Sequence, residues 1–312
     1  MYKSHQRSVL FLNNQTIALI DLGSNSIQMA IYNVNEDLRI FHEVERVKVA
    51  ARLINHLNEQ GFLTEEGIQL IITIFKEFQK TAEKYGTGRI TGYATAVIRN
   101  SLNQEEILAE IAARTDIAIS VISGYEEARY GYLGVVNSMN AVEGITLDIG
   151  GGSTEITLFR NREMVHYHSF QFGAVNLHEA YTKGKRVTEN QLTQLRRYIL
   201  DSIQTLPWLK NAGLPIIGIG GSAKNLSRIH NAKFGGAELK LHEISSIFSE
   251  LSSLNVDERS KVKGLSKKRR DIILPAIGIV SQMMETVRSP HFVYCDKTVR
   301  DGIMYKMLEE KQ

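Results

Sequence analysis

The stretch Asp148-Ile149-Gly150-Gly151-Gly152-Ser153-Thr154 determines how the rest of this sequence is interpreted. Glycines permit positive φ angles and let a ligand approach the backbone closely. Successive free N–H groups in such a turn form a concave surface that binds anions. The residues Ile145-Thr146-Leu147 before the turn predict a strand. The pattern therefore predicts a phosphate-binding loop at the end of a strand. A purely structural hairpin turn is the alternative, although a hairpin needs fewer glycines.

The carboxylate of Asp148 stands directly before this loop, where it would repel a phosphate. The position becomes favourable when a cation lies between the two, because Mg²⁺ is held by one or two carboxylates together with phosphate oxygens. Glu155, just past the loop, is the second carboxylate expected to hold this ion. The loop residues expected to bind phosphate are Gly150, Gly151, Gly152 and Ser153.

An earlier stretch, Asp21-Leu22-Gly23-Ser24-Asn25-Ser26, has the same organisation of strand, Asp-x-Gly turn and second strand. Asp21 and Asp148 are about one domain length apart, which indicates a duplicated domain rather than a short repeat. Two such loops facing each other would hold a phosphoryl group from both sides. The first loop therefore adds Asp21 to the predicted metal carboxylates and three phosphate-binding residues, Gly23, Ser24 and Asn25. Taken alone, an Asp-x-Gly turn is often only structural.

The composition is that of a globular protein. Of 312 residues, 43% are hydrophobic and 23% charged, which excludes a disordered chain. The net charge of +3 is too small to indicate nucleic-acid binding by itself. A single cysteine, Cys295, excludes an internal disulfide and a four-cysteine zinc site. No stretch approaches the roughly 20 apolar residues of a membrane span, and the apolar run 9–12 is too short for a signal peptide. We therefore expect a cytoplasmic protein.

Strand and helix patterns alternate along the chain, as is typical of an α/β protein. Strands are expected at 16–20, 27–34, 38–44, 117–122, 145–147, 155–160, 164–170 and 215–219. Helices are expected at 64–85, 101–114, 126–138, 188–206, 222–229, 243–254, 270–287 and 298–310. Capping-box patterns at Ser101–Gln104 and Thr188–Gln191 predict two of the helix starts. We expect a first domain at 1–125 and a second at 126–297. The helix at 298–312 is expected to pack back on the first domain, and the site is expected in the cleft between the two.

A third glycine turn, Gly218-Ile219-Gly220-Gly221-Ser222-Ala223, follows a predicted strand and opens a predicted helix. Its N–H groups and the helix N-terminus suit another anion or a nucleoside. Lys224 and Asn225 stand where a dinucleotide fingerprint needs a glycine, so that fingerprint is excluded. The residues expected to bind phosphate here are Gly220, Gly221 and Ser222. Tight packing of strand on helix is the structural alternative.

These loops resemble those of the superfamily of actin, sugar kinases and heat-shock chaperones. Four segments look specifically like the exopolyphosphatase/guanosine pentaphosphate phosphohydrolase family. They are Asp21–Ser26, Tyr93-Ala94-Thr95-Ala96-Val97-Ile98-Arg99, Val121-Ile122-Ser123-Gly124-Tyr125-Glu126-Glu127-Ala128-Arg129, and Asp148–Glu155. Gly264-Leu265 with Arg270-Asp271-Ile272-Ile273, and Arg300-Asp301-Gly302, also match. The resemblance covers essentially the whole chain. It implies two actin-like (ribonuclease H-like) domains and cleavage of phosphoanhydride bonds with water and Mg²⁺ or another divalent cation.

The resemblance also implies roles for single residues. Glu127 is implied as the carboxylate that positions or activates the attacking water, and Arg99 as an arginine that contacts the phosphate chain. Arg270 is implied as a further phosphate contact. The residues alone say less, because Glu126 and Glu127 both open a helix, where the helix dipole favours acidic side chains.

Two positions depart from the family pattern. Gln28 stands where some relatives carry a basic residue, and Asn176 replaces an arginine. Both changes concern the strength of substrate binding and not the reaction class. The chain also stops at Gln312, without the helical domain that longer relatives append, which suggests the short form of the family. Processive cleavage of long chains is then in doubt, unless a homodimer supplies more surface. The basic residues within 259–270 are expected to guide a polyanion, or else to form a solvated face.

The sequence thus favours hydrolysis of terminal phosphoanhydride bonds of inorganic polyphosphate, with release of orthophosphate. The alternative is removal of the 5′-phosphate of guanosine pentaphosphate, giving guanosine tetraphosphate. A small-molecule kinase of the same superfamily and a non-catalytic polyphosphate or alarmone sensor are two further hypotheses. No membrane or nucleic-acid partner is expected.

Overall fold

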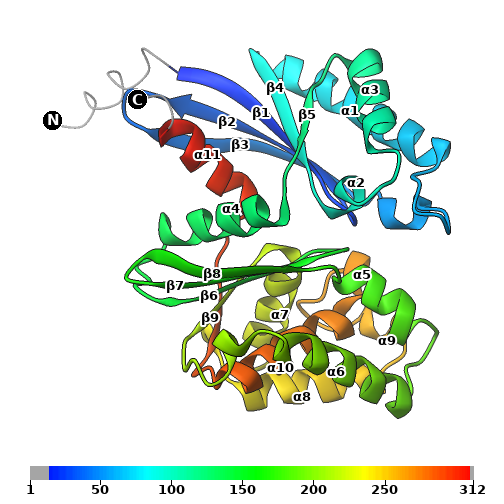
Figure 1. Ribbon diagram of the computed structural model, residues 1–312, viewed down its shortest axis with the longest axis vertical. Coiled ribbons are helices and arrows are strands. Elements are labelled where there is room, and N and C mark those ends of the chain that lie inside the picture. Colours follow the sequence, from blue (N-terminus) through cyan, green and yellow to red (C-terminus); the bar gives the residue numbers. More distant parts are fainter. Residues whose placement is uncertain (1–13, 310–312) are drawn as a thin grey trace, which may run out of the picture.

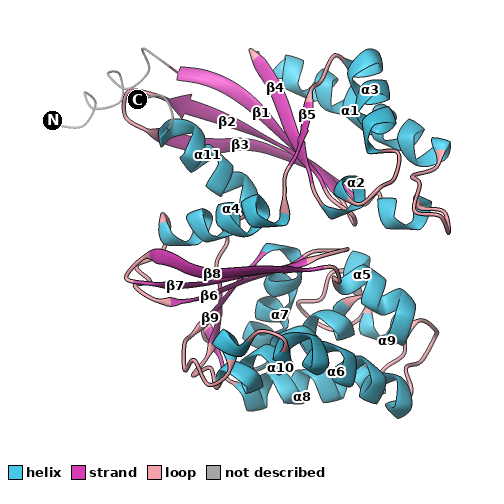
Figure 2. Cartoon of the chain, in the orientation of Figure 1, coloured by secondary structure: helices cyan, strands magenta, loops and turns pink. Residues whose placement is uncertain are grey.

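The chain folds into two α/β halves, each built on one β-sheet, in the computed structural model, which describes residues 14–309. Figure 1 shows the two sheets one above the other, with helices α4 (Gly124–Val136) and α11 (Val299–Glu309) between them. Figure 2 shows that the other helices cover the outer faces of the sheets. The predicted fold class is confirmed. The predictions made for residues 1–13 and 310–312 lie outside the described residues.

The first sheet has the strand order β3-β2-β1-β4-β5. Its strands are β1 (Asn14–Leu22), β2 (Ile27–Asn35), β3 (Ile40–Val49), β4 (Arg89–Ala94) and β5 (Ile119–Val121). The first three are antiparallel, and β4 and β5 run parallel to β1. Because side chains alternate along a strand, β1 contributes to two cores. Ala18 and Ile20 pack toward α1 (Glu65–Lys84), α2 (Ala96–Arg99) and α3 (Gln104–Thr115), whereas Ile17 and Leu19 pack toward α4 and α11.

The second sheet repeats this order and direction as β8-β7-β6-β9-β11, with β10 added beside β11. Its strands are β6 (Gly144–Ile149), β7 (Thr154–Arg160), β8 (Glu163–Phe170), β9 (Ile216–Ile219), β10 (Glu238–Leu239) and β11 (Phe292–Tyr294). β1 and β6 are therefore equivalent central strands. Asp21 and Asp148 stand at the same point of these two strands, as a duplicated domain requires.

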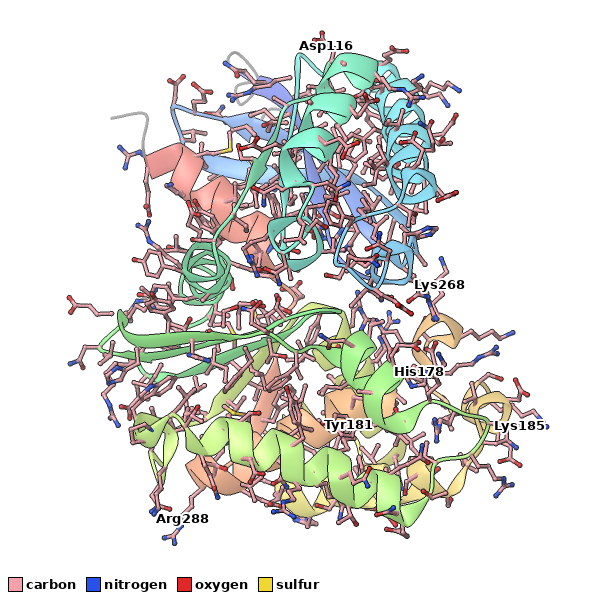
Figure 3. The ribbon with its side chains drawn as sticks, turned by 45° about the vertical axis from the view of Figure 1, so that its right-hand side comes forward. Asp116, His178, Tyr181, Lys185, Lys268 and Arg288 are labelled. Carbon is pink, nitrogen blue, oxygen red and sulfur yellow. The ribbon has the colours of Figure 1, made fainter. Side chains whose placement is uncertain are left out.

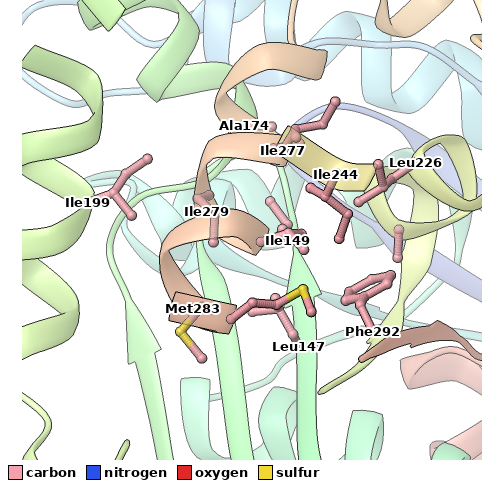
Figure 4. Close-up of a cluster of buried hydrophobic side chains, with 14 of the residues drawn as sticks. Leu147, Ile149, Ala174, Ile199, Leu226, Ile244, Ile277, Ile279, Met283 and Phe292 are labelled. Carbon is pink, nitrogen blue, oxygen red and sulfur yellow. The ribbon is translucent and has the colours of Figure 1, made fainter. Parts of the chain in front are cut away.

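A large apolar core fills the space between the second sheet and its helices. The helices are α5 (Ala174–Leu177), α6 (Glu189–Gln204), α7 (Gly220–Lys233), α8 (Leu241–Ser253), α9 (Val256–Arg259) and α10 (Ile273–Val287). Shorter helical turns are η1 (Leu53–His56), η2 (His178–Thr182), η3 (Pro207–Leu209) and η4 (Lys267–Arg269). Figure 4 shows Leu147 and Ile149 of β6 among Ile277, Met283 and Phe292. This core fixes the end of β6, where the glycine loop begins.

Helix α4 contributes to the cores of both halves. Tyr130 packs with the first sheet and α11, whereas Tyr132 and Val135 pack with the second sheet. α4 and α11 cross at Gly302, where a Cβ atom would lie 1.8 Å from the carbonyl oxygen of Tyr130. The expected domain boundary at residue 125 stays a prediction.

The secondary-structure predictions hold with a few differences. The capping box at Ser101–Gln104 is wrong, because Ser101 Oγ donates to the carbonyl of Val97 at 2.7 Å and α3 begins at Gln104. The box at Thr188–Gln191 is confirmed. The short strands β4, β10 and β11 were not predicted from the pattern. Within residues 14–309, no helix is long and apolar enough to cross a membrane.

Candidate active site

The two Asp-x-Gly loops have the same turn and lie against each other. Gly23 N donates to the carbonyl of Ser26 at 3.2 Å, and Gly150 N donates to the carbonyl of Ser153 at 3.0 Å. A Cβ atom on Gly151 would lie 3.1 Å from the Cβ atoms of both Ser24 and Asn25. The close approach of the loops therefore favours glycine at position 151.

Positive φ is not the reason for these glycines, contrary to the expectation from sequence. The loop glycines Gly23, Gly150, Gly151 and Gly152 all lack it, and only Gly220 of the third turn has it, with φ of 74°. A Cβ atom on Gly220 would also lie 2.6 Å from Oδ1 of Asp148. The third turn is thus drawn close to the carboxylate that precedes the second loop.

Strand register brings polar side chains into one row on each sheet. In the first sheet, Asp21 pairs with Gln28, and Gln28 pairs with Lys48 on β3. In the second sheet, Asp148 pairs with Glu155, and Glu155 pairs with Ser169 on β8. Directly opposed residues on neighbouring strands lie on the same face of the sheet. The position of Gln28 in one half is therefore that of Glu155 in the other.

A cavity of about 380 Å³ lies between the two halves. Its wall contains most of the residues predicted from sequence. They are Asp21, Gly23, Ser24, Asn25, Glu127, Asp148, Gly150, Gly151, Ser153, Gly220 and Gly221. Five predicted residues stand outside this wall: Arg99, Gly152, Glu155, Ser222 and Arg270. The ion pair of Arg52 with Asp271, at 2.7 Å, bridges the two halves.

The N-terminus of α4 separates the two neighbouring glutamates. Glu126 completes a capping box, because its carboxylate accepts from Ser123 N at 2.8 Å and its own N–H donates to Ser123 Oγ at 3.2 Å. Glu127 is instead buried and faces the cavity. Arg99 lies behind it and donates to Glu127 Oε2 and to the carbonyl of Ile122, both at 2.9 Å. The guanidinium thereby fixes the orientation of the carboxylate.

Glu155 and Ser222 lie directly behind the wall. Glu155 accepts from Ser169 Oγ at 2.7 Å, and its other oxygen, Oε2, is buried with no partner among the described residues. Ser222 Oγ donates to the carbonyl of Ile149 at 3.0 Å and thereby ties the third turn to β6. Ser222 thereby supports a residue of the cavity wall, whereas Glu155 is bonded to Ser169 outside it.

Burial raises the pKa values of all four carboxylates. The pKa of Asp148 rises to about 6, with the charge of Asp21 adding to the effect. The pKa of Glu127 rises to about 7, because burial outweighs the opposing effect of Arg99. The pKa of Glu155 lies well above its ordinary value, through burial and the charges of Glu127 and Asp148. Burial also raises the pKa of Asp21, although Arg300, 3.3 Å away, opposes the rise. Close carboxylates of this kind favour a bound cation or a shared proton.

Among the cations of the cavity, Arg269 was predicted only as part of the basic segment 259–270 and not as a site residue. Its guanidinium donates to Ser222 Oγ at 3.1 Å and lies against Gly221, where a Cβ atom would be 2.1 Å from Nη2. Arg270, predicted in its place, lies outside the cavity wall with its guanidinium 3.9 Å from the carboxylate of Asp257. Adjacent basic residues in a run cannot be told apart by sequence. We therefore replace Arg270 by Arg269 among the candidate phosphate contacts.

The basic segment 259–270 is not one solvated face. Arg259 is fully buried, and its Nε donates to the carbonyl of Leu251 at 2.9 Å. Lys268 and Arg269 line the cavity, whereas Lys261 and Lys263 are exposed and do not. Only one end of the segment therefore reaches the candidate site.

Lys48 was missed, and Arg300, although part of a segment that matches the family, was given no role. Arg300 is buried beside Asp21, and Lys48 reaches the cavity from β3. Partial burial lowers the pKa of Lys48 to about 8, and the nearby charge of Arg269 adds to the effect. The alternation of side chains along β3 is the signal that could have pointed to Lys48, once the facing strand was known.

The two departures from the family pattern have different surroundings. Gln28 lines the cavity directly opposite Lys48, so a cation is present on the neighbouring strand. Asn176 accepts from Gly173 N at 2.6 Å through Oδ1, and its Nδ2 donates to the carbonyl of Gly152 at 3.4 Å. Asn176 therefore braces the second glycine loop.

The carboxylates around the cavity fit a divalent cation only in part. Within the described chain, no three His, Cys, Asp or Glu side chains converge to hold a metal by themselves. Mg²⁺ does not need such a cage, since it binds through one or two carboxylates, phosphate oxygens and water. Asp21 and Asp148 face the same cavity, and the unpartnered oxygen of Glu155 lies beside Asp148 in the ladder. The residues therefore fit a cation whose coordination is completed by phosphate oxygens of the substrate.

A comparison with known protein families assigns the chain to one of them. The model of the Ppx/GppA phosphatase family matches residues 18–311. The chain belongs to this family. Its members among solved structures include one from Aquifex aeolicus, with 24% identity, a TM-score of 0.81 and coverage of 96% of this chain and 99% of that one. At this level of identity, the likeness establishes the fold.

Three curated relatives of this Ppx/GppA chain have different names. One is a bifunctional 3-dehydroquinate synthase/phosphatase of Fusobacterium nucleatum, 25% identical over 96% of this chain and 47% of that protein. Another is a Haemophilus influenzae protein named as a candidate exopolyphosphatase, 22% identical over 95% of this chain and 92% of its own length. The third is a guanosine-5′-triphosphate,3′-diphosphate pyrophosphatase of Pseudoalteromonas atlantica, 25% identical over 95% of this chain and 59% of that protein. The chain thus spans about half the length of two of these relatives. The names of the last two denote hydrolysis of phosphoanhydride bonds, which is the class of enzyme that the family match indicates.

Proposed function

We propose that this Ppx/GppA protein hydrolyses the terminal phosphoanhydride bond of inorganic polyphosphate and releases orthophosphate. The observation that carries the proposal is the position of Glu127. Its carboxylate is buried in the wall of a cavity that two glycine loops also line, and Arg99 holds it at 2.9 Å. A single oriented carboxylate beside anion-binding loops is what attack of water on a bound phosphoryl group requires.

In the proposed reaction, Glu127 orients a water molecule and accepts its proton as the water oxygen bonds to the terminal phosphorus. The anhydride P–O bond breaks, and the shortened chain leaves with the electron pair. A pKa near 7 suits this role, because the carboxylate is then both a sufficient base and largely deprotonated slightly above neutral pH.

The transferred phosphoryl group is held from both sides. The N–H groups of Gly23 and Gly150 donate within their own turns, so the other N–H groups of the two loops and the guanidinium of Arg269 would donate to its oxygens. Asp148 and Asp21, with Glu155 behind them, would hold Mg²⁺ or another divalent cation. Such a cation would offset the negative charge of the phosphates.

The second candidate substrate is guanosine pentaphosphate. The observation that favours it is the third turn, whose Gly220 and Gly221 reach the same cavity. The Pseudoalteromonas relative is named for this type of substrate. A nucleoside beside this turn would have to displace Arg269, which lies against Gly221. Polyphosphate needs no such displacement, so we place it first.

The test measures orthophosphate release with Mg²⁺ from long-chain polyphosphate and from guanosine pentaphosphate, side by side, and again with excess EDTA. We expect faster release from polyphosphate and loss of activity in EDTA. Glu127→Gln should abolish release but spare polyphosphate binding, whereas Glu126→Gln should keep the activity. Activity of Glu127→Gln at the wild-type level would contradict the mechanism. Binding without any turnover in the wild type would support a sensor, and transfer of phosphate from ATP to a small acceptor would support a kinase.

A further inference from the structure

The cavity extends beyond the carboxylates between two pairs of basic residues. Arg46 and Lys48 come from β3 of the first half, and Lys224 and Arg228 come from α7 of the second half. All four line the same cavity. None of them is used in the proposed hydrolytic step.

Each pair forms a row along its element. Residues two apart on a strand point to the same face, with about 6.6 Å between them. Residues four apart on a helix also share a face, with about 6 Å between them along the axis. One row therefore runs along each side of the cavity.

The charged groups around each cation indicate which cations lie close to the site and which lie farther out. Lys48 lies within reach of Asp21, Arg269 and Arg300, and so stands at the inner end beside the site. Burial raises the pKa of Tyr294, and both Arg46 and Arg228 oppose this rise. The two guanidinium groups, from opposite halves, therefore lie near the same hydroxyl. Asp296, whose charge adds to the rise, also lines the cavity, so one carboxylate lies near this hydroxyl as well.

Several of these cations have no ion-pair partner among the described residues. Arg300 is paired with Asp21, and Arg46 with Glu43. By contrast, Lys48, Lys224 and Arg228 form no ion pair with any residue in the range 14–309. Lys268, labelled in Figure 3 where the lower half faces the upper one, also lines the cavity without such a pair. Unpaired like charges around one cavity repel one another, and a bound polyanion relieves that repulsion.

We propose that the rows on β3 and α7 form an anion track that binds the phosphates of the substrate beyond the one being cleaved. This inference rests on the proposed hydrolysis at the same site. The ligand class that fits is a linear chain of phosphates, because the track offers a cation at regular intervals on both sides. The track thereby makes affinity depend on chain length, up to the number of phosphates it can reach.

The experiment compares Michaelis constants for tripolyphosphate and for long-chain polyphosphate. In the double variant Lys224→Gln/Arg228→Gln, we expect the KM for long chains to rise about tenfold or more, since removing a single charged hydrogen bond typically weakens binding by about that factor. The KM for tripolyphosphate should change by less than about threefold, because a short substrate ends before the outer cations. The wild-type preference for long chains should also fall more steeply with added salt than that of the variant.

The matched control is Lys261→Gln/Lys263→Gln, which removes the same charge from exposed positions outside the cavity. It should leave the Michaelis constants for both substrates as in the wild type. The two failures are distinguishable. Absence of phosphate release from any polyphosphate by the wild type would overturn the proposed function. Normal wild-type hydrolysis, with the same ratio of Michaelis constants in the track variant, would overturn the track alone.

Discussion

Replacing Glu127 by Gln should abolish hydrolysis. It should also increase the free energy of unfolding relative to the wild type, and this increase should be larger at alkaline pH than at acidic pH. The native protein holds this carboxylate in a buried wall, 2.9 Å from Arg99, with the charges of Asp148 and Asp21 nearby. Its ionised form is therefore disfavoured in the folded state and free of this penalty in the unfolded chain.

The magnitude follows from the change in pKa. Burial raises the pKa of Glu127 from an ordinary 4.5 to about 7. That difference corresponds to ~3 kcal/mol of unfolding free energy. A group with a raised folded pKa contributes its stability below the unfolded value and loses it as the pH rises through the folded value. The wild type should thus lose ~3 kcal/mol through this group between about pH 4.5 and 8. Glu127→Gln should not, because the amide carries no charge and can still accept from Arg99.

The assay is urea unfolding of both proteins at pH 5 and pH 8 in the presence of EDTA, with the free energy taken from linear extrapolation. The difference between variant and wild type should grow by about 2 kcal/mol or more from pH 5 to pH 8. Glu126→Gln is the control, since its carboxylate caps α4 and the backbone N–H of Ser123 lowers its pKa. That variant should show no stabilisation at pH 8. An equal effect of Glu127→Gln at both pH values would refute the reasoning.

The same geometry leads to three more predictions. Gly221→Ala places a methyl group 2.1 Å from Nη2 of Arg269, so the guanidinium must move. The kcat/KM should fall as far as in Arg269→Ala, with Tm within about 2 °C of the wild type. Full activity would contradict the position assigned to Arg269 in the site. Arg300→Met removes the buried partner of Asp21 and should cost ~3 kcal/mol in urea unfolding, because the remaining group loses its counter-charge; a neutral effect would argue against the pair. The kcat/KM of the wild type should rise with pH through about 7, since Glu127 must be deprotonated to accept a proton; a flat profile from pH 5.5 to 8 would exclude it as the base.

Much of the site could be predicted because its residues belong to local patterns. The turn Asp148–Thr154 and its earlier copy at Asp21–Ser26 are continuous in sequence, and both face the cavity where expected. Glu127 and Arg99 came from a resemblance to a family, and the structure brings them within 2.9 Å. Their placement on α4 and α2 has no local signature, since acidic residues at a helix start are common.

The differences within the site share one physical cause, which is that the sequence does not state which side of a segment faces the cleft. Arg270 was chosen over Arg269 because nothing in a run of basic residues reports direction. Lys48 was missed because its neighbour across the ladder, Gln28, is known only once β2 and β3 are paired. The expectation of positive φ in the glycine loops failed for a similar reason, since the crowding that favours Gly151 comes from the opposite loop.

The sequence by itself determined the α/β class, the duplicated strand–loop–strand unit and the loop carboxylates Asp21, Asp148 and Glu155, because these depend on periodicity and on turns within a few residues. Only the tertiary structure decided which charges meet. The register of two separate sheets and the crossing of α4 with α11 bring Asp21, Asp148 and Glu127 and the rows of β3 and α7 around one cavity. Burial there shifts the pKa values, and burial is a property of the packed halves and not of any segment alone.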